Sequence, residues 1–127
     1  LELDERTEKP YFYRSQVETV RAIHRLLTGD LERHYTIAQL SRQFSIPATA
    51  LKACFKSVYG QPVGAYMRLF RMDRAALLLR QEPQASVAEI AGRVGYDSAS
   101  KFSAAFKEAK GKSSLEFRRE SRKNSSG

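Results

Sequence analysis

Hydrophobic residues recur every three or four positions along most of this chain, which is the spacing of the buried face of an α-helix. The first such stripe, formed by Val17, Val20, Ile23 and Leu27, predicts a helix over residues 15–27. The glycine and aspartate that follow this stripe are typical residues for a helix end. The polar, mixed-charge residues before it predict a linker.

Two short motifs predict where later helices begin. Thr36 and Gln39 have the spacing of a capping box, in which the hydroxyl accepts a hydrogen bond from a backbone amide and the glutamine reaches back. Ser86 and Glu89 repeat this arrangement. Each motif therefore predicts the start of a short amphipathic helix.

A tight turn and a second helix are expected after the first short helix. The turn falls at Ser45 and Ile46, and the helix begins at Pro47, runs through about residue 58 and buries Phe55 on its inner face. Gly60 is expected to end it in a left-handed conformation.

The longest predicted helix covers residues 63–81, and the proline after Glu82 closes it. Its expected buried stripe consists of Leu69, Met72, Ala76 and Leu79.

The second half of the chain predicts the same sequence of elements. Gly95 permits the positive φ of a sharp turn, and Asp97 is expected to cap a helix that ends near Lys110. A final short helix over residues 114–120 is expected before a solvated tail. Because no segment alternates between apolar and polar residues, the predicted fold class is all-α, with about seven helices.

The two halves resemble each other at equivalent buried positions. The paired residues are Leu40 with Ile90, Phe44 with Val94, Leu51 with Phe102, Phe55 with Phe106, Lys56 with Lys107 and Gly60 with Gly111. A helix, a tight turn and an amphipathic second helix form the helix-turn-helix motif, whose second helix lies in the DNA major groove. The predicted organisation is a linker (1–14), a first helix-turn-helix subdomain (15–62), a linker helix (63–82), a second subdomain (83–121) and a tail (122–127).

The predicted linker helix sets the distance between the two motifs. A helix of roughly 18 residues rises ~27 Å at 1.5 Å per residue. This length is comparable with the ~34 Å repeat of B-DNA, so both second helices are expected to reach adjacent major grooves.

Composition narrows the possible partners. The chain has 127 residues, with 22 Lys and Arg against 14 Asp and Glu, a net charge of +8 and a pI near 9.9. This surplus favours a polyanion, with nucleic acid ahead of an acidic membrane. The single Cys54 excludes an internal disulfide, and the two scattered histidines cannot complete a zinc site with it.

The sequence gives little support for a membrane protein, a secreted protein or an enzyme. No apolar run approaches the roughly 20 residues of a membrane span, and no signal peptide is recognisable. We therefore expect a cytoplasmic protein without a cofactor, a metal or a membrane partner. No set of residues suits catalysis, so an enzyme is not expected. The start at Leu1 suggests a fragment of a longer protein.

The second unit carries the residues of a known family. Ile90-Ala91-Gly92-Arg93-Val94-Gly95-Tyr96-Asp97-Ser98, followed by Phe102-Ser103, Phe106-Lys107 and Gly111, resembles the signature of the AraC/XylS transcription regulators. The resemblance extends over about two thirds of the chain, with supporting matches in the first unit and the linker helix. It implies a DNA-binding domain that regulates bacterial transcription, as an activator more often than as a repressor.

The resemblance also implies a role for individual side chains. The positions that read bases in this family correspond to Thr49, Lys52, Ala53, Ala99, Ser100, Lys101 and Ala104. Contacts with phosphate would fall to Lys56, Arg68, Arg71, Lys107, Lys110 and Lys112. Lysine suits guanine, serine and threonine suit several base edges, and alanine suits the thymine methyl group.

The sequence departs from the family pattern at several of these places. Ala53 and Ala104 stand where a long polar side chain is common, so recognition is expected to depend more on DNA shape. Ser45 stands where a glycine is usual, and Pro47 stands where a serine is usual.

Two further partners follow from the resemblance. The family implies RNA polymerase as a possible partner, and an effector or dimerisation domain that is missing from this sequence.

An alternative is that the helices dock a protein and that the basic surface is incidental. Protein-docking helices would show exposed Leu, Phe or Trp at their starts, where this chain has lysine and small residues.

Overall fold

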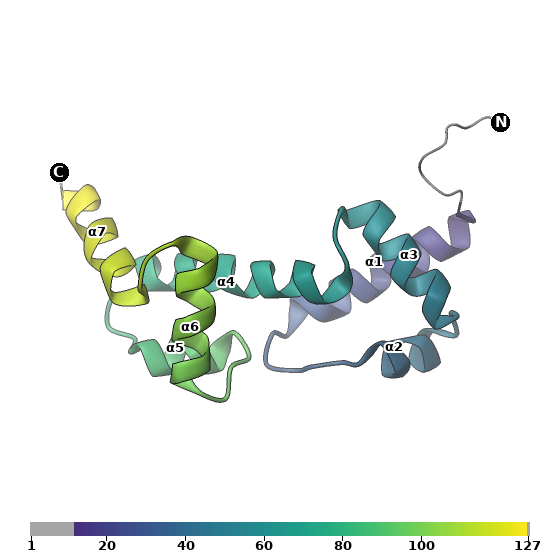
Figure 1. Ribbon diagram of the computed structural model, residues 1–127, viewed down its shortest axis with the longest axis horizontal. Helices are drawn as coiled ribbons and strands as arrows, with labels where there is room; N and C mark the ends of the chain where they lie inside the picture. The colour runs from purple at the N-terminus through teal and green to yellow at the C-terminus, as the bar shows by residue number, and fades with distance from the viewer. Residues whose placement is uncertain (1–11, 127) are drawn as a thin grey trace. The chain divides into compact units, whose positions relative to one another are not determined.

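The computed structural model describes residues 12–126, and all the regular structure in this range is α-helical. The helices are α1 (Arg14–Gly29), α2 (Ile37–Phe44), α3 (Ala48–Tyr59), α4 (Val63–Gln81), α5 (Val87–Arg93), α6 (Ala99–Lys110) and α7 (Ser114–Ser126) (Figure 1). The predicted all-α class is confirmed. Most of the predicted N-terminal linker lies outside the described residues, and α1 begins within its last few positions.

The chain divides into two units. The first comprises Leu1–Gly29 and Tyr35–Met67, and its described part holds α1, α2, α3 and the start of α4. Helix α1 packs against α3 and α2. The fully buried residues of this unit include Ile23, Leu51 and Phe55, as their spacing in the sequence requires.

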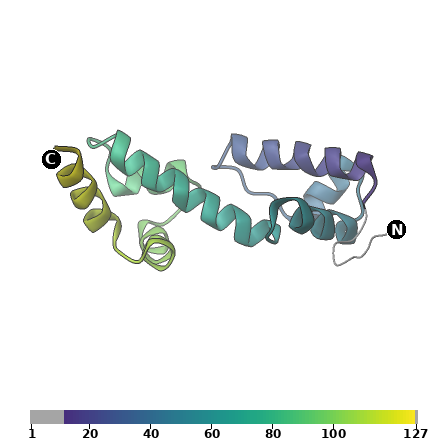
Figure 2. The same cartoon turned by 90° about the horizontal axis from the view of Figure 1, so that it is seen from above.

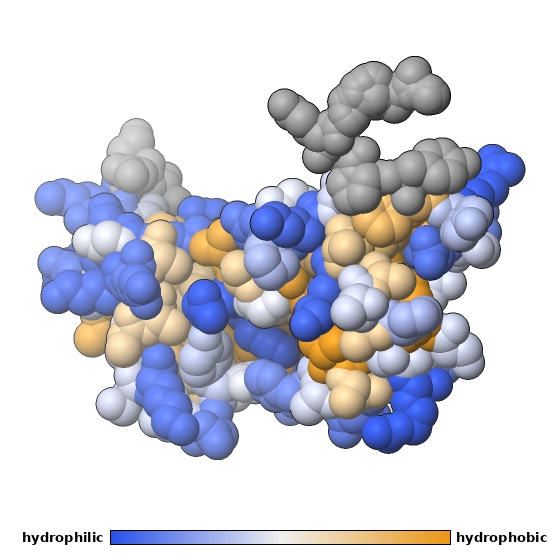
Figure 3. Space-filling model, turned by 45° about the vertical axis from the view of Figure 1, so that its right-hand side comes forward, coloured by the Kyte–Doolittle hydropathy of each residue, from blue (hydrophilic) through white to orange (hydrophobic). Residues whose placement is uncertain are grey.

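The second unit comprises Asp30–His34 and Arg68–Gly127, and it holds the rest of α4 together with α5, α6 and α7. Helix α6 packs against α5 and α7. Its core contains Ile90, Phe102 and Phe106, which are fully buried. Hydrophilic side chains cover much of the visible surface of each unit (Figure 3).

Helix α4 is one continuous helix of 19 residues (Figure 2). Met72, Ala76 and Leu79 are buried as predicted, but Leu69 is 43% exposed. The buried stripe instead includes Arg71 and Ala75, which leaves Leu69 at its solvent edge.

Helix α7 is longer than the sequence suggested, because it continues to Ser126 and the predicted end near residue 120 is wrong. Ser113 and Glu116 form a third pair of reciprocal capping hydrogen bonds, of 3.0 and 3.1 Å, at its start. No glycine or proline interrupts the sequence before Ser126. The helix therefore extends into the segment that was expected to be a solvated tail.

Candidate nucleic-acid interface

The turn of the first unit depends on a non-glycine residue in a left-handed conformation. The capping box of Thr36 and Gln39 opens α2, and Ser45 ends this helix with φ of 52°. The Ser41 hydroxyl donates a hydrogen bond of 2.6 Å to the carbonyl of Ile46. Pro47 then occupies the N-cap position of α3, one residue before the helix.

Helix α3 has one buried face and one exposed face. Leu51, Cys54 and Phe55 are fully buried. The candidate base-reading residues of this unit, Thr49, Lys52 and Ala53, are all exposed, as is Lys56 one turn later. Burial raises the pKa of the Cys54 thiol, which is consistent with a packed side chain rather than a reactive one.

The turn of the second unit depends on a glycine in a left-handed conformation. Gly95 has φ of 94°, as its position in the sequence predicted. The N-cap of α6 is Ser98, whose hydroxyl accepts a hydrogen bond of 3.2 Å from the amide of Lys101. The prediction that Asp97 caps this helix is therefore wrong by one residue, because Ser98 has the extended backbone conformation of an N-cap.

Helix α6 repeats the arrangement of α3. Phe102 and Phe106 are fully buried, so they are core residues rather than platforms for stacking bases. The exposed residues of α6 include the four candidate base readers and one phosphate candidate, namely Ala99, Ser100, Lys101, Ala104 and Lys107.

Five of the six candidate phosphate contacts fall into two groups. Lys56, Arg68 and Lys107 are exposed. Lys110 instead lies 2.5 Å from the carboxylate of Asp73, and Lys112 forms an ion pair with Glu120. These two lysines would have to share their charge with a protein carboxylate.

Arg71 has a different environment from the one expected of a phosphate contact. It is 7% exposed, and its guanidinium donates a hydrogen bond of 3.4 Å to the carbonyl of Arg33. Burial lowers its pKa, partly offset by Tyr96. A side chain enclosed in this way does not present its charge to DNA, so the assignment of Arg71 to phosphate is not supported.

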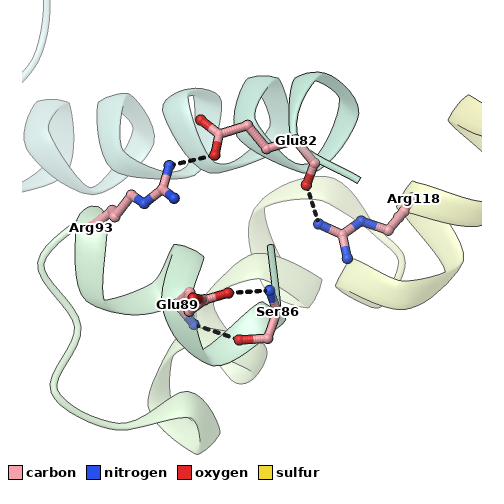
Figure 4. Close-up of polar contacts among 5 residues, drawn as sticks. All are labelled: Glu82, Ser86, Glu89, Arg93 and Arg118. Atoms are coloured by element: carbon pink, nitrogen blue, oxygen red, sulfur yellow. Dashed lines mark hydrogen bonds and ion pairs between the residues drawn. The ribbon is translucent and has the colours of Figure 1, made fainter. Parts of the chain in front are cut away.

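Arg118 is a buried residue that the sequence does not single out. This residue is 9% exposed, and its guanidinium donates to the carbonyl of Leu79 at 3.2 Å and to that of Glu82 at 3.1 Å. Figure 4 shows the hydrogen bond to Glu82. The carbonyl of Leu79 lies in the last turn of α4, where the helix supplies no backbone donor, so Arg118 satisfies it. The sequence gives no signal for this role, because the acceptors lie far away along the chain.

Sequence reasoning also overlooked the connection between α1 and α2. Leu31 is buried, and the imidazole Nε2 of His34 lies 2.7 Å from the carbonyl oxygen of Gly95. An apolar residue between Asp30 and Glu32 was the one available sign that this loop is packed.

The described residues contain no group of three or more His, Cys, Asp or Glu that could hold a metal ion. None of the described helices has the length and apolar character needed to cross a bilayer.

Comparison with known proteins identifies related domains. A family model described as a helix-turn-helix domain matches residues 40–120. An AraC-like transcription regulator of Streptomyces lividans is 37% identical over 93 residues, covering 73% of this chain and 30% of the relative. The transcriptional activator RhaR of an Enterobacter species is 31% identical over 97 residues, covering 76% of this chain and 34% of the relative.

A solved structure shows the same fold. The DNA-binding domain of AdpA, crystallised with a target DNA, superposes with a TM-score of 0.77 at 21% identity, covering 84% of this chain and 95% of that one. The chain spans about a third of the length of the curated relatives that it matches.

Proposed function

This chain belongs to the AraC-type helix-turn-helix family of DNA-binding bacterial transcription regulators, and we propose that α3 and α6 read specific base sequences in successive major grooves of one duplex. The observation that carries the proposal is the two-sided character of both helices. Phenylalanine is fully buried on one face of each helix (Phe55 in α3, Phe102 and Phe106 in α6), while the first turns expose lysine and small residues.

The exposed residues suit base edges. Lys52 and Lys101 can donate to the O6 and N7 atoms of guanine, and Thr49 and Ser100 can pair with several bases. Ala53, Ala99 and Ala104 can contact the thymine methyl group. Because three of the seven readers are alanine, we propose that DNA shape contributes a substantial share of the specificity.

Non-specific affinity would come from the exposed cations. Lys56 and Lys107 occupy equivalent positions late on the exposed faces of α3 and α6, and Arg68 is exposed on α4. We assign phosphate contacts to these three residues. Lys110 and Lys112 would join them if DNA displaced the paired carboxylates.

The length of α4 supports the use of two grooves. Its 19 residues span ~28 Å at 1.5 Å per residue, which is close to the ~34 Å helical repeat of DNA. A domain with two reading helices on one chain would not need a symmetric partner to recognise a site of two half-sites.

The wider role follows from the relatives. RhaR is named as a transcriptional activator, so activation is the proposed sign of regulation. We propose that the domain acts in the cytoplasm, that it contacts RNA polymerase at a promoter, and that an effector or dimerisation domain accompanies it in the full-length protein.

Selection of bound sequences from a random duplex pool tests the proposal. The expected result is a motif with two half-sites separated by about one helical turn of DNA. A selected motif with a single half-site would contradict the use of two grooves. Recovery of no enriched sequence would contradict sequence-specific binding altogether.

A further inference from the structure

The connection between α1 and α2 is part of the second unit. The chain leaves the first unit after α1, contributes Asp30–His34 to the second unit, and returns at Tyr35. We call Asp30–His34 the strap. Leu31 anchors it, because this side chain is only 5% exposed.

The strap contacts the turn of the second helix-turn-helix directly. The Nε2–H group of His34 donates a hydrogen bond of 2.7 Å to the carbonyl oxygen of Gly95. The carbonyl oxygen of Leu31 would lie 2.2 Å from a Cβ atom at position 95. Strap and turn therefore fit together only because residue 95 has no side chain.

Arg71 supports the strap from the interior. Its guanidinium donates to the carbonyl of Arg33, and its Nε atom is buried without a hydrogen-bond partner. Burying a cation without a carboxylate partner is unfavourable, so the charge of Arg71 adds little to the free energy of unfolding. It fills the space beneath the strap, and its guanidinium carbon lies 3.3 Å from the same Cβ position at Gly95.

The turn that the strap contacts leads directly into α6. The ring of Tyr96 packs edge-on against Phe102, with 5.8 Å between the ring centroids. Two residues after Tyr96, Ser98 caps α6 through the amide of Lys101. A shift at Gly95 would therefore change where α6 begins and where the side chains of its first turn point.

We propose that His34 is a positioning residue for DNA recognition, which holds the start of α6 through the strap. The inference rests on the proposed function, and it goes further by placing a determinant of second-unit specificity outside the helix-turn-helix motif. Neither His34 nor Leu31 needs to touch DNA.

The test compares His34→Ala with His34→Gln, whose amide can also donate, and with Glu32→Ala, an exposed change in the same loop. Each protein is titrated with the selected DNA site and with two versions in which one half-site is scrambled. The half-site read by α6 is the one at which Lys101→Ala changes the preference.

We expect His34→Ala to lose about fivefold in affinity on the intact site, the usual worth of one hydrogen bond. This loss should vanish when the α6 half-site is scrambled and persist when the other half-site is scrambled. His34→Gln should recover most of the affinity, and Glu32→Ala should match the wild type. Equal losses at both half-sites, or no loss, would overturn the inference.

Amide hydrogen exchange provides a readout without DNA. His34→Ala should accelerate exchange at Tyr96 and Lys101 by about fivefold, the equilibrium change expected from one lost hydrogen bond, and Glu32→Ala should not. Unchanged exchange would overturn positioning by His34. Wild-type protein that binds no selected DNA would instead overturn the proposed function.

Discussion

At the scale of single residues, position 95 requires a glycine for two separate reasons. Its φ of 94° is one that side-chain-bearing residues rarely adopt, and a strap carbonyl occupies the space of the missing Cβ. Gly111 shares the first requirement, with φ of 78°, but has no atom within 4 Å of its Cβ position. A side chain at position 111 would therefore meet backbone strain alone, whereas a side chain at position 95 would meet both backbone strain and a steric clash.

Gly95→Ala should therefore destabilise the second unit more than Gly111→Ala. The left-handed conformation should cost each variant about 1 kcal/mol. The clash with the carbonyl of Leu31 should add about 1–3 kcal/mol to Gly95→Ala alone. Chemical denaturation of both variants measures the difference, and equal stabilities would show that the strap moves aside freely.

Lysines at different places on α3 and α6 should have different effects on DNA binding. Lys52→Ala and Lys101→Ala should each change the preference at one base pair by about 1–3 kcal/mol. Lys107→Ala should weaken binding to all sequences alike, because a phosphate contact carries no base information. Repeating the selection from the random duplex pool with each variant tests both expectations. If Lys52→Ala and Lys101→Ala behaved in the same way as Lys107→Ala, the assignment of Lys52 and Lys101 to base contacts would be refuted.

At the scale of elements, both helix-turn-helix motifs begin with the same local device. Thr36 with Gln39 and Ser86 with Glu89 each form reciprocal side-chain-to-backbone hydrogen bonds. The second of these capping boxes is drawn in Figure 4. The hydrogen bonds to Ser86 hold the pKa of Glu89 below its usual range. Short helices of this kind need such caps, because they have few internal hydrogen bonds of their own.

Removal of one cap should be measurable. Ser86→Ala should lower the free energy of unfolding by about 1 kcal/mol, since one amide at the start of α5 loses its acceptor. Ser103→Ala, on the exposed face of α6, is the matched control and should be neutral or slightly stabilising. Thermal unfolding compares the two, and equal melting temperatures would mean that the cap contributes nothing.

Packing of elements in the first unit places a histidine among aromatic rings. The ring of His24 in α1 stacks on the ring of Tyr59 in α3, with 4.3 Å between the ring centroids. The Nε2 atom of His24 also forms a hydrogen bond of 2.8 Å with the hydroxyl of Tyr66 in α4. Burial, followed by the nearby charge of Arg25, lowers the pKa of His24 below its ordinary value of 6.5. The surroundings of His24 therefore favour its neutral form over the protonated form.

The first unit should accordingly lose stability in acid. As the pH falls below about 6.5, the unfolded chain takes up a proton at His24 before the folded chain does. The free energy of unfolding should decrease from there until the pH reaches the lower, folded pKa. His24→Gln cannot ionise and should flatten this part of the stability profile; an unchanged profile would mean that other groups cause the acid sensitivity.

At the scale of the whole molecule, the net charge of +8 should control affinity for DNA. A protein that neutralises three to five phosphates loses roughly 40-fold to 500-fold in affinity between 50 and 200 mM salt. We expect a dependence of this order from a fluorescence anisotropy titration of the selected site. Binding that is insensitive to salt would exclude a phosphate-gripping surface and would favour docking of a protein.

The sequence alone determined the local features of this protein. Helical periodicity, the two capping boxes and the positive φ at Gly60, Gly95 and Gly111 depend on neighbours a few residues away, so they can be predicted without a fold. The buried state of Phe55, Phe102 and Phe106 follows from the same spacing. The errors in local prediction were the cap of α6, displaced by one residue, the length of α7 and the burial of Leu69.

Only the tertiary structure decided the fate of side chains whose partners are distant in sequence. Arg71 and Arg118 are both buried against carbonyl groups of remote segments, although each appears in the sequence as a surface cation. His34 reaches Gly95 across 61 positions of chain. A long polar side chain can satisfy its charge in water or on a buried carbonyl, and the packing of distant segments, which local patterns do not encode, determines which of these occurs.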